Sequence, residues 1–242
     1  MSSLSNSRPA PLGVRHALLV FTGPRSLFAR MADTSAYGWA LLTMLVLIVL
    51  IGYAEVQTGL IDRDIDVRTE RNLEELERTQ GGLIDRVEFR DRADALRKEG
   101  VFLKTMANLG VIVATPAYFL ASFLMISSVL YAVVALTGRK PEYHTLMAIC
   151  VYAGFIELVG LGLRLGMMLY YRTTDVQTSL AGLVKDGGPK FLAAIDPFHL
   201  WFWGLVTLGL IVTHQLSRRM AQFTCGIMVL GSVGVRALIA YQ

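Results

Sequence analysis

Residues 143–169 read YHTLMAICVYAGFIELVGLGLRLGMML, and this stretch decides the fold class. A helix needs about 20 apolar residues to cross a bilayer, so the stretch is long enough. It nevertheless contains two charged residues, Glu157 and Arg164, each of which costs roughly 3 kcal/mol in hydrocarbon on insertion scales. Such residues persist in membrane helices where they find partners or a watery cavity. The stretch therefore predicts a membrane-spanning helix with polar chemistry inside it.

Hydrophobic residues make up 54% of the 242-residue chain, more than the 45–50% typical of soluble domains. The excess is concentrated in blocks of about the length that spans hydrocarbon. The five predicted spans are residues 37–54, 109–136, 145–169, 198–216 and 223–240. A backbone in lipid must satisfy its own hydrogen bonds, so each span should be a helix. We therefore expect an all-α, polytopic membrane protein with five transmembrane helices.

Basic residues beside the apolar runs predict the orientation, because cytoplasmic flanks carry an excess of Lys and Arg. They gather in three segments: Arg8, Arg15, Arg25 and Arg30 before the first span, Arg139 and Lys140 after the second, and Arg218 and Arg219 after the fourth. With five spans these segments fall on one side, which predicts a cytoplasmic N-terminus and an outer C-terminus. We divide the chain into a cytoplasmic arm (1–36) and a membrane domain (37–242).

An extracytoplasmic segment, residues 55–108, has 10 basic and 13 acidic residues. Apolar residues recur in it at spacings near three and four, which predicts helix, and Gly81-Gly82 predicts a break between two helices. Its candidate partner-contact residues are Leu73, Leu76, Val87 and Leu96. The segment is either a solvated, salt-bridged hairpin packed on itself or a docking arm for a partner or a second copy. In a second outer segment, residues 170–197, the pattern predicts a short helix that lies on the outer surface of the membrane or covers the ends of the spans.

The cytoplasmic arm contains GPRSLFARMAD, in which Pro24 starts a predicted helix with Leu27, Phe28 and Met31 on one face. Pro is favoured at the first helical position. An apolar face opposite arginines predicts a helix lying on the membrane surface. A partner-binding helix has the same pattern, so Leu27 and Phe28 are also candidate partner contacts.

Depth along the spans ranks the ion-pair candidates. At a rise of 1.5 Å per residue, Glu157 lies roughly 18 Å and Arg236 roughly 20 Å from the starts of their spans. We therefore predict that Glu157 pairs with Arg236, with Arg164 as the second candidate. A static link between helices, a polar path for ions or protons, and a contact with another subunit all remain open. His199, at the outer end of the fourth span, is expected at a different depth from Glu157.

No metal-ligand or catalytic spacing is present, so we expect neither metal nor cofactor and no enzyme. The net charge of +4 is too mild to indicate nucleic-acid binding. The aromatic residues Trp39, Trp201 and Trp203 lie near span ends and are interpreted as interfacial anchors.

Several stretches, in order, resemble the Yip1 domain family, and especially its bacterial branch. They are FTGPRSLFARMAD, VVALTGRKPEYHTLMAICVYAGF, TSLAGLV and IDPFHLWFWGLVTLGLIVTHQLSRRMA. The most family-like piece is Asp196-Pro197-Phe198 followed by Trp201. Where family members often have a proline shortly after the tyrosine of the third span, this chain has Glu157 after Tyr152.

The resemblance implies a five-span, noncatalytic membrane protein. Eukaryotic relatives act in vesicle traffic, and some bacterial relatives are linked to ABC-type exporters. We therefore expect a multi-pass protein of the bacterial inner membrane, in contact with lipid and with protein partners. Its predicted role is an accessory or scaffold subunit, whose partner is an ABC-type permease or ATPase or a second copy. The alternatives are a small channel or transporter using Glu157 and Arg236, and a membrane-organising protein.

Overall fold

The computed structural model describes residues 16–31, 36–80, 84–174, 176, 178–179 and 195–240, the last six as backbone only. Every regular element in these residues is a helix. The chain divides into two units, each described by itself. The first comprises residues 1–47, 119–161 and 177–242, and the second comprises residues 48–118 and 162–176. Most of the predicted outer segment 170–197 lies outside the described residues.

Three helices among the described residues are long and apolar enough to cross a membrane. They are α3 (Gly38–Gln57), the continuous helix Arg86–Leu136, and α7 (Tyr143–Tyr171). They coincide with the first three predicted spans. The fourth predicted span corresponds to α8 (Pro197–Thr213), which is apolar but has 17 residues, and the fifth to α9 (Arg218–Ala240). The chain is thus a helical, multi-pass membrane protein, while the count of five remains a prediction.

The helix Arg86–Leu136 consists of α5 (Arg86–Leu109), a π-helical stretch η2 (Gly110–Ala114) and α6 (Thr115–Leu136). The π-helical stretch ends two residues before Pro116. A proline inside a helix has no N–H to donate, and its ring clashes with the carbonyl four residues earlier. A π-bulge accommodates such a residue without ending the helix. The predicted second span therefore has no helix boundary at residue 109.

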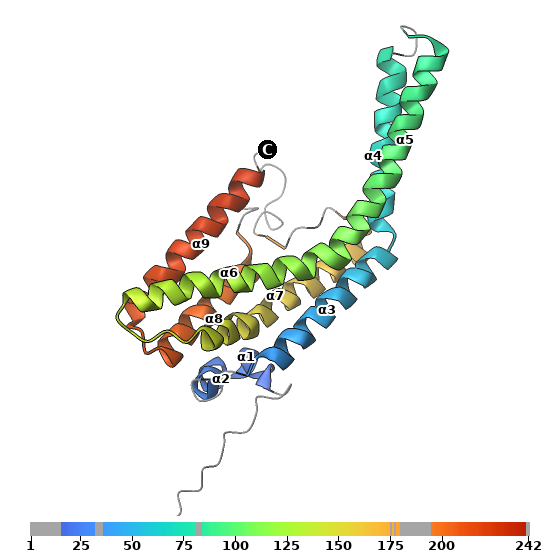
Figure 1. Ribbon diagram of the computed structural model, residues 1–242. Helices are drawn as coiled ribbons and strands as arrows, with labels where there is room; N and C mark the ends of the chain where they lie inside the picture. The colour runs from blue at the N-terminus through green and yellow to red at the C-terminus, as the bar shows by residue number, and fades with distance from the viewer. Residues whose placement is uncertain are drawn as a thin grey trace, which may run out of the picture. The chain divides into compact units, whose positions relative to one another are not determined.

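The core of the first unit is built around α7, in which every residue from Thr145 to Ile156 is buried. Glycines allow close packing on two sides of it. A Cβ atom added at Gly154 would lie 2.5 Å from the ring of Phe123, and one at Gly209 of α8 would lie 2.6 Å from Ile149. Figure 1 shows α8 beside α7.

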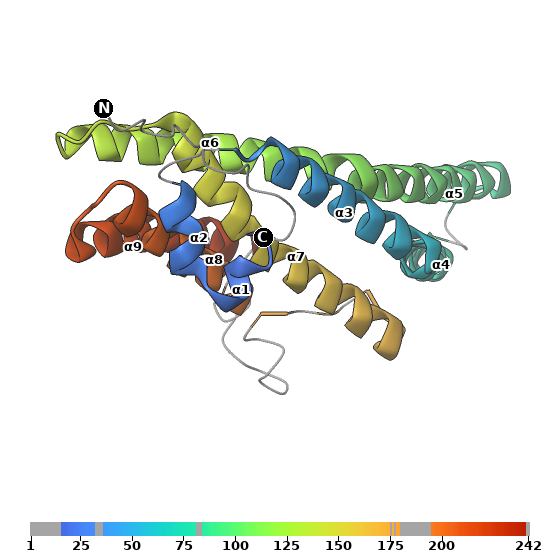
Figure 2. The same ribbon diagram turned by 90° about the horizontal axis from the view of Figure 1, so that it is seen from below.

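The helices α1 (Leu19–Thr22) and α2 (Pro24–Met31) also belong to the first unit. As predicted, α2 begins at Pro24. Its apolar face, however, packs against α8, and Leu27, Phe28 and Met31 are completely buried there (Figure 2). This corrects the expectation that Leu27 and Phe28 face lipid or a partner. The amphipathic pattern of α2 thus buries its apolar face against another helix of the same chain.

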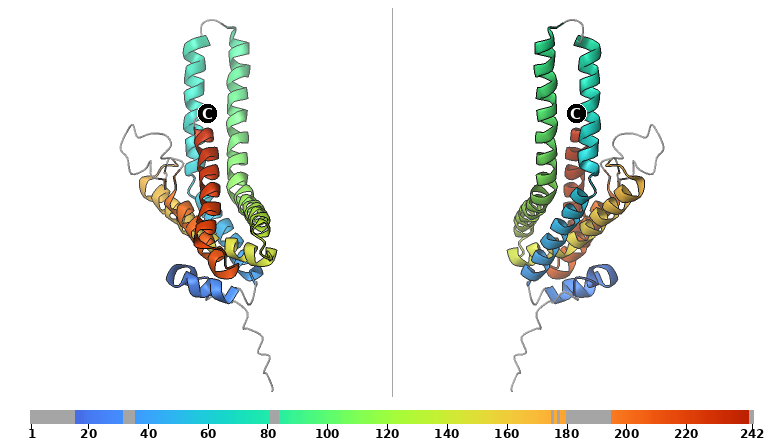
Figure 3. Two further views of the ribbon diagram at one scale, coloured as in Figure 1. Left: turned by 90° about the vertical axis from the view of Figure 1, so that its left-hand side faces the viewer. Right: turned by 90° about the vertical axis from the view of Figure 1, so that its right-hand side faces the viewer.

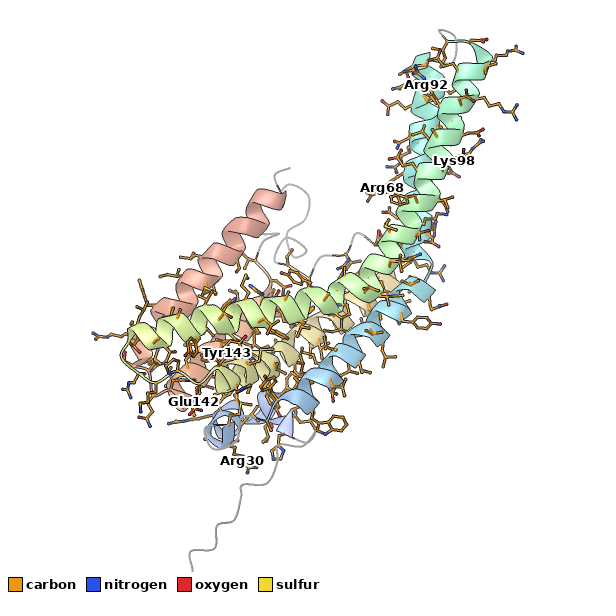
Figure 4. The ribbon with its side chains drawn as sticks, viewed as in Figure 1. Arg30, Arg68, Arg92, Lys98, Glu142 and Tyr143 are labelled. Carbon is orange, nitrogen blue, oxygen red and sulfur yellow. The ribbon has the colours of Figure 1, made fainter. Side chains whose placement is uncertain are left out.

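The second unit contains a hairpin of α4 (Leu60–Gln80) and α5, which lie side by side in both views of Figure 3. The two helices approach closely at Gly100 of α5 and Thr69 of α4, where the threonine hydroxyl would lie 2.7 Å from a Cβ atom added at Gly100. Asp85 caps α5 by accepting a hydrogen bond from the backbone N–H of Arg86 (2.7 Å). Arg68, Arg92 and Lys98, labelled in Figure 4, lie on this hairpin, and Arg92 of α5 donates a hydrogen bond to Gln80 of α4.

Candidate functional site

Glu157 of α7 and His199 of α8 form the centre of a polar cluster in the first unit. The distance from Glu157 Oε1 to His199 Nδ1 is 2.9 Å. Both side chains are largely enclosed, with 20% of Glu157 and 11% of His199 exposed. The expectation that these residues lie at different depths is therefore wrong.

The lengths of the two helices explain the correction. Glu157 lies 14 residues after the start of α7 and His199 lies 14 residues before the end of α8. Each residue is thus about 21 Å from the shared end of the antiparallel pair. The contact between Ile149 and Gly209 fixes the same register. Because α8 is much shorter than α7, its first turn reaches only the middle of α7.

The Asp196-Pro197-Phe198 sequence sets the position of His199. Asp196 caps α8, since its Oδ1 accepts a hydrogen bond from the backbone N–H of Phe198 (2.9 Å). Pro197 is the first residue of the helix, where its missing N–H is no loss. The ring of Phe198 packs on Gly160 of α7, where an added Cβ atom would be 3.0 Å away. His199 is placed opposite Glu157 by the Asp196 cap, by the helix start at Pro197 and by the contact of Phe198 with Gly160.

Two further residues contact the other ring nitrogen of His199. The indole N–H of Trp203 donates to His199 Nε2 (3.1 Å), and Ser232 Oγ of α9 lies 3.0 Å from the same atom. A donor at Nε2 requires an unprotonated nitrogen there, which assigns the proton to Nδ1 and directs it at Glu157. The geometry is that of a neutral histidine held between a carboxylate and an indole.

Ser232, His199 and Glu157 lie in the order of a catalytic serine, histidine and carboxylate, but they are not arranged as a nucleophile and its base. A base must be free to accept the serine proton. Here the lone pair of His199 Nε2 already accepts the indole N–H of Trp203. The Ser232 hydroxyl can donate instead to the backbone carbonyl of Val229 (2.8 Å). The cluster therefore joins α7 to α8 through the hydrogen bond of Glu157 with His199, and Ser232 of α9 lies 3.0 Å from the same histidine.

Arg164, the second ion-pair candidate, belongs to the second unit. Its Nη2 atom lies 3.9 Å from Oε1 of Glu55 on α3. The side chain of Arg236, on α9, lies outside the described residues, so its pairing with Glu157 stays a prediction.

The other predicted site residues have varied positions. Trp203 is buried in the polar cluster, which corrects its interpretation as an interfacial anchor, whereas Trp201 is half-exposed and makes an edge-on contact with Phe21. Leu73, Leu76 and Leu96 of the hairpin are partly buried, and Val87 is exposed. The described residues contain no group of three His, Cys, Asp or Glu side chains arranged to hold a metal ion.

The model of the Yip1 domain matches residues 18–238 of the chain. The chain belongs to the Yip1 domain family. No curated protein and no solved structure gives a significant match. The Yip1 domain thus includes every helix from α3 to α8.

Sequence reasoning missed the roles of His199, Trp203 and Ser232 in this Yip1 domain. Two signals could have found them. His199 and Trp203 are four residues apart and so share a helix face. Counting residues from the end at which α7 starts and α8 ends, instead of from assumed membrane boundaries, would have placed His199 level with Glu157.

Proposed function

We propose that this Yip1-domain chain is a noncatalytic accessory or scaffold subunit of a bacterial inner-membrane complex that contains an ABC-type exporter. The proposal places five spans in the membrane, the N-terminus in the cytoplasm, and the hairpin of α4 and α5 outside, where it contacts the partner. The observation that carries it is the poor burial of this hairpin.

The structure describes α4 in full and buries none of its side chains. In α5 the buried residues are Ala93 and Gly100. A two-helix hairpin gains most of its stability from packing an apolar face, because isolated helices are marginal in water. This hairpin instead exposes Val87 and Val101, each at 66%. A partner surface that covers these residues would supply the missing burial.

Ion pairs provide the hairpin with little compensation. Three of its pairs join residues within one helix: Arg68 with Asp64, Arg92 with Glu88, and Arg97 with Asp94. Lys104 and Asp66 link the two helices at 2.7 Å. Exposed pairs of this kind contribute about 0–1 kcal/mol each. This comparison favours the docking arm over a hairpin that is stable alone.

Photo-cross-linking in cells tests the partner role. A photoreactive residue at Val87 or Val101 should capture an exporter permease or ATPase, identified by mass spectrometry after purification in mild detergent. The matched control is Leu136, which is 86% exposed at the end of α6. Capture of a second copy at both hairpin positions would indicate self-association instead. Recovery of only the uncross-linked chain would contradict the proposal.

Thiol labelling tests the orientation. Cys150 and Cys225 are both buried and can be replaced by alanine to give a cysteine-free background. Single cysteines at Arg139 and Arg218 should react only after the inner membrane is opened, whereas one at Arg68 should react from outside. Labelling of all three from one side would contradict the five-span topology.

The hydrogen-bond network around Glu157 favours a structural role for this residue over ion conduction. Its carboxylate has a neutral histidine donor at 2.9 Å, and that histidine is held in turn by Trp203. Ion flux through reconstituted protein that is lost in Glu157→Gln would contradict the structural role.

A further inference from the structure

A groove in the first unit follows one face of α8 and is lined by α2, α8 and α9, with a volume of about 790 Å³. The two outer helices, α2 and α9, each pack against α8 (Figure 2). The floor of the groove consists of α8 residues that recur at spacings of three and four and so share one helix face: Gly204, Thr207, Leu208, Ile211 and Val212. Gly209, which contacts Ile149 of α7, lies on a different face of α8. The groove therefore opens on a side of α8 that α7 does not cover.

The floor of the groove is largely apolar and only partly covered. Leu208, Ile211 and Val212 are half-buried, whereas α8 residues on other faces, such as Val206 and Leu210, are buried. The floor extends to Gly204, nine residues before the end of α8, which is about 14 Å along the helix. A Cβ atom added at Gly204 would have no heavy atom within 4 Å, so this end of the groove is open. In a bilayer, an apolar helix surface of this kind is covered by acyl chains.

Two arginines, one on each outer helix, give the groove its charge. Arg25 lies in the first turn of α2, and Arg218 is the first residue of α9. Both are exposed, and none of the ion pairs among the described residues involves either of them. The described residues that line the groove include no acid, and Gln222 adds an amide one turn after Arg218. The lining therefore complements an anion.

The arginine of α9 lies where the apolar helices end. A short turn joins the end of α8 at Thr213 to the start of α9 at Arg218, so this arginine is level with the end of α8. Basic residues at the ends of membrane helices lie beside the lipid headgroups. From Arg218 the floor continues past Ile211 and Leu208 to Gly204. The groove thus has a cationic end and an apolar length, which is the order of charge and hydrocarbon in an anionic lipid.

We propose that this groove binds one anionic phospholipid of the phosphatidylglycerol class. The phosphate lies between Arg25 and Arg218, Gln222 donates to the headgroup, and an acyl chain follows the floor of α8 toward Gly204. An ethanolamine or choline headgroup is disfavoured, because its ammonium would be repelled by two guanidinium groups. In the proposed orientation the lipid belongs to the cytoplasmic leaflet. The site requires α8 to lie in the membrane but not the exporter partner, so either proposal can fail alone.

Lipid titration of the whole chain tests the headgroup. Protein stripped of lipid in detergent is titrated with dioleoyl-phosphatidylglycerol, and bound lipid is counted by mass spectrometry of the intact protein. One tightly bound molecule per chain is expected. Dioleoyl-phosphatidylethanolamine and dioleoyl-phosphatidylcholine should bind about tenfold more weakly, since each brings an ammonium toward the arginines. This comparison uses the parent protein and does not depend on the folding of any variant.

Charge variants assign the headgroup to the groove. Arg25→Gln and Arg218→Gln should each weaken binding of phosphatidylglycerol about tenfold, because each removes a charge-assisted hydrogen bond. The matched control is Arg219→Gln, which removes the same charge from an exposed position of α9 outside the groove and should leave binding unchanged. All three positions are exposed, so the variants should keep the melting temperature of the parent, which is measured alongside.

A bulky side chain at the open end of the groove tests the path of the acyl chain. Gly204→Trp should weaken binding of phosphatidylglycerol about tenfold, because the indole takes the place of about two buried methylene groups. Gly231→Trp is the matched control. It adds the same ring at an open position of α9 outside the groove and should leave binding unchanged.

Five results would overturn the proposal. Equal binding of the three lipids would show that the charge is not recognised. Equal affinities of the groove and control arginine variants would place the headgroup elsewhere, and equal affinities of the two tryptophan variants would place the acyl chain elsewhere. Full competition by free glycerophosphoglycerol would identify a soluble phosphate compound as the ligand. Capture of a polypeptide instead of lipid by a photoreactive residue at Ile211 would make the groove a protein interface.

Discussion

Glu157 and His199 face each other across two antiparallel helices, with Glu157 Oε1 2.9 Å from His199 Nδ1. Each lies 14 residues from the end that α7 and α8 share. The hydrogen bond joins the middle of one helix to the first turn of the other. It therefore holds the start of α8 at the level of Glu157, the charged residue in the middle of α7.

This contact predicts energetic coupling between the two residues. Glu157→Ala and His199→Ala should each lower the free energy of unfolding, and the double variant should lose about 0.5–3 kcal/mol less than the sum, as contacting residues do. Unfolding of purified protein in detergent measures all four states of the cycle. Strictly additive losses would contradict a direct contact.

The predicted pair of Glu157 with Arg236 requires a cycle of its own. Glu157→Gln, Arg236→Gln and their combination should also show non-additive losses if the guanidinium reaches the carboxylate. Protein level in membranes and melting temperature are the measurements. Coupling with His199 but not with Arg236 would exclude Arg236 from the network around Glu157.

Asp196→Ala should destabilise the protein by about 1 kcal/mol, because the first turn of α8 loses the cap at the Phe198 N–H. Asp196→Asn retains an acceptor oxygen at the same position and is the matched control. Thermal unfolding in detergent distinguishes the two. An asparagine variant as unstable as the alanine variant would mean that the charge, and not the cap, is what matters.

Gly209→Ala should destabilise the packing of α8 on α7 by about 1–3 kcal/mol, since the new methyl would lie 2.6 Å from Ile149. Gly204 is on the same helix, and no heavy atom lies within 4 Å of a Cβ atom added there. Gly204→Ala should therefore be neutral or stabilising, because alanine favours helix. If both variants melt at the same temperature, the close approach of α7 and α8 is absent.

His214 should make the stability depend on pH. It lies one residue beyond α8, where burial lowers its pKa below 6.5, with Glu142 opposing part of that effect. The unfolded chain then binds more protons than the folded chain below pH 6.5, so stability is fully present above that pH and falls on acidification. The slope cannot exceed about 1.4 kcal/mol per pH unit for one proton.

Melting curves between pH 7.5 and 5.5 measure this dependence. His214→Gln should flatten the curve, and Glu142→Gln should steepen it, because the carboxylate supports the protonated ring. A parent protein whose stability is constant over this range would contradict the buried, neutral state of His214.

The sequence by itself determined the class of the protein and the type of its elements. Apolar runs such as residues 143–169 must be helices in lipid, since no water satisfies the backbone there. Pro24 fixed the start of α2, and the spacing of Leu27, Phe28 and Met31 fixed its apolar face. These properties depend on neighbours within one or two turns, which a sequence displays directly.

Only the tertiary structure decided which groups meet. Whether Leu27 and Phe28 face lipid, a partner or α8 depends on where another helix lies. Whether Glu157 meets His199 depends on the length of α8, the cap at Asp196 and the contact of Gly209 with Ile149. Depth in a helix pair is set by the register between helices, and register is a property of packed surfaces that no single segment contains.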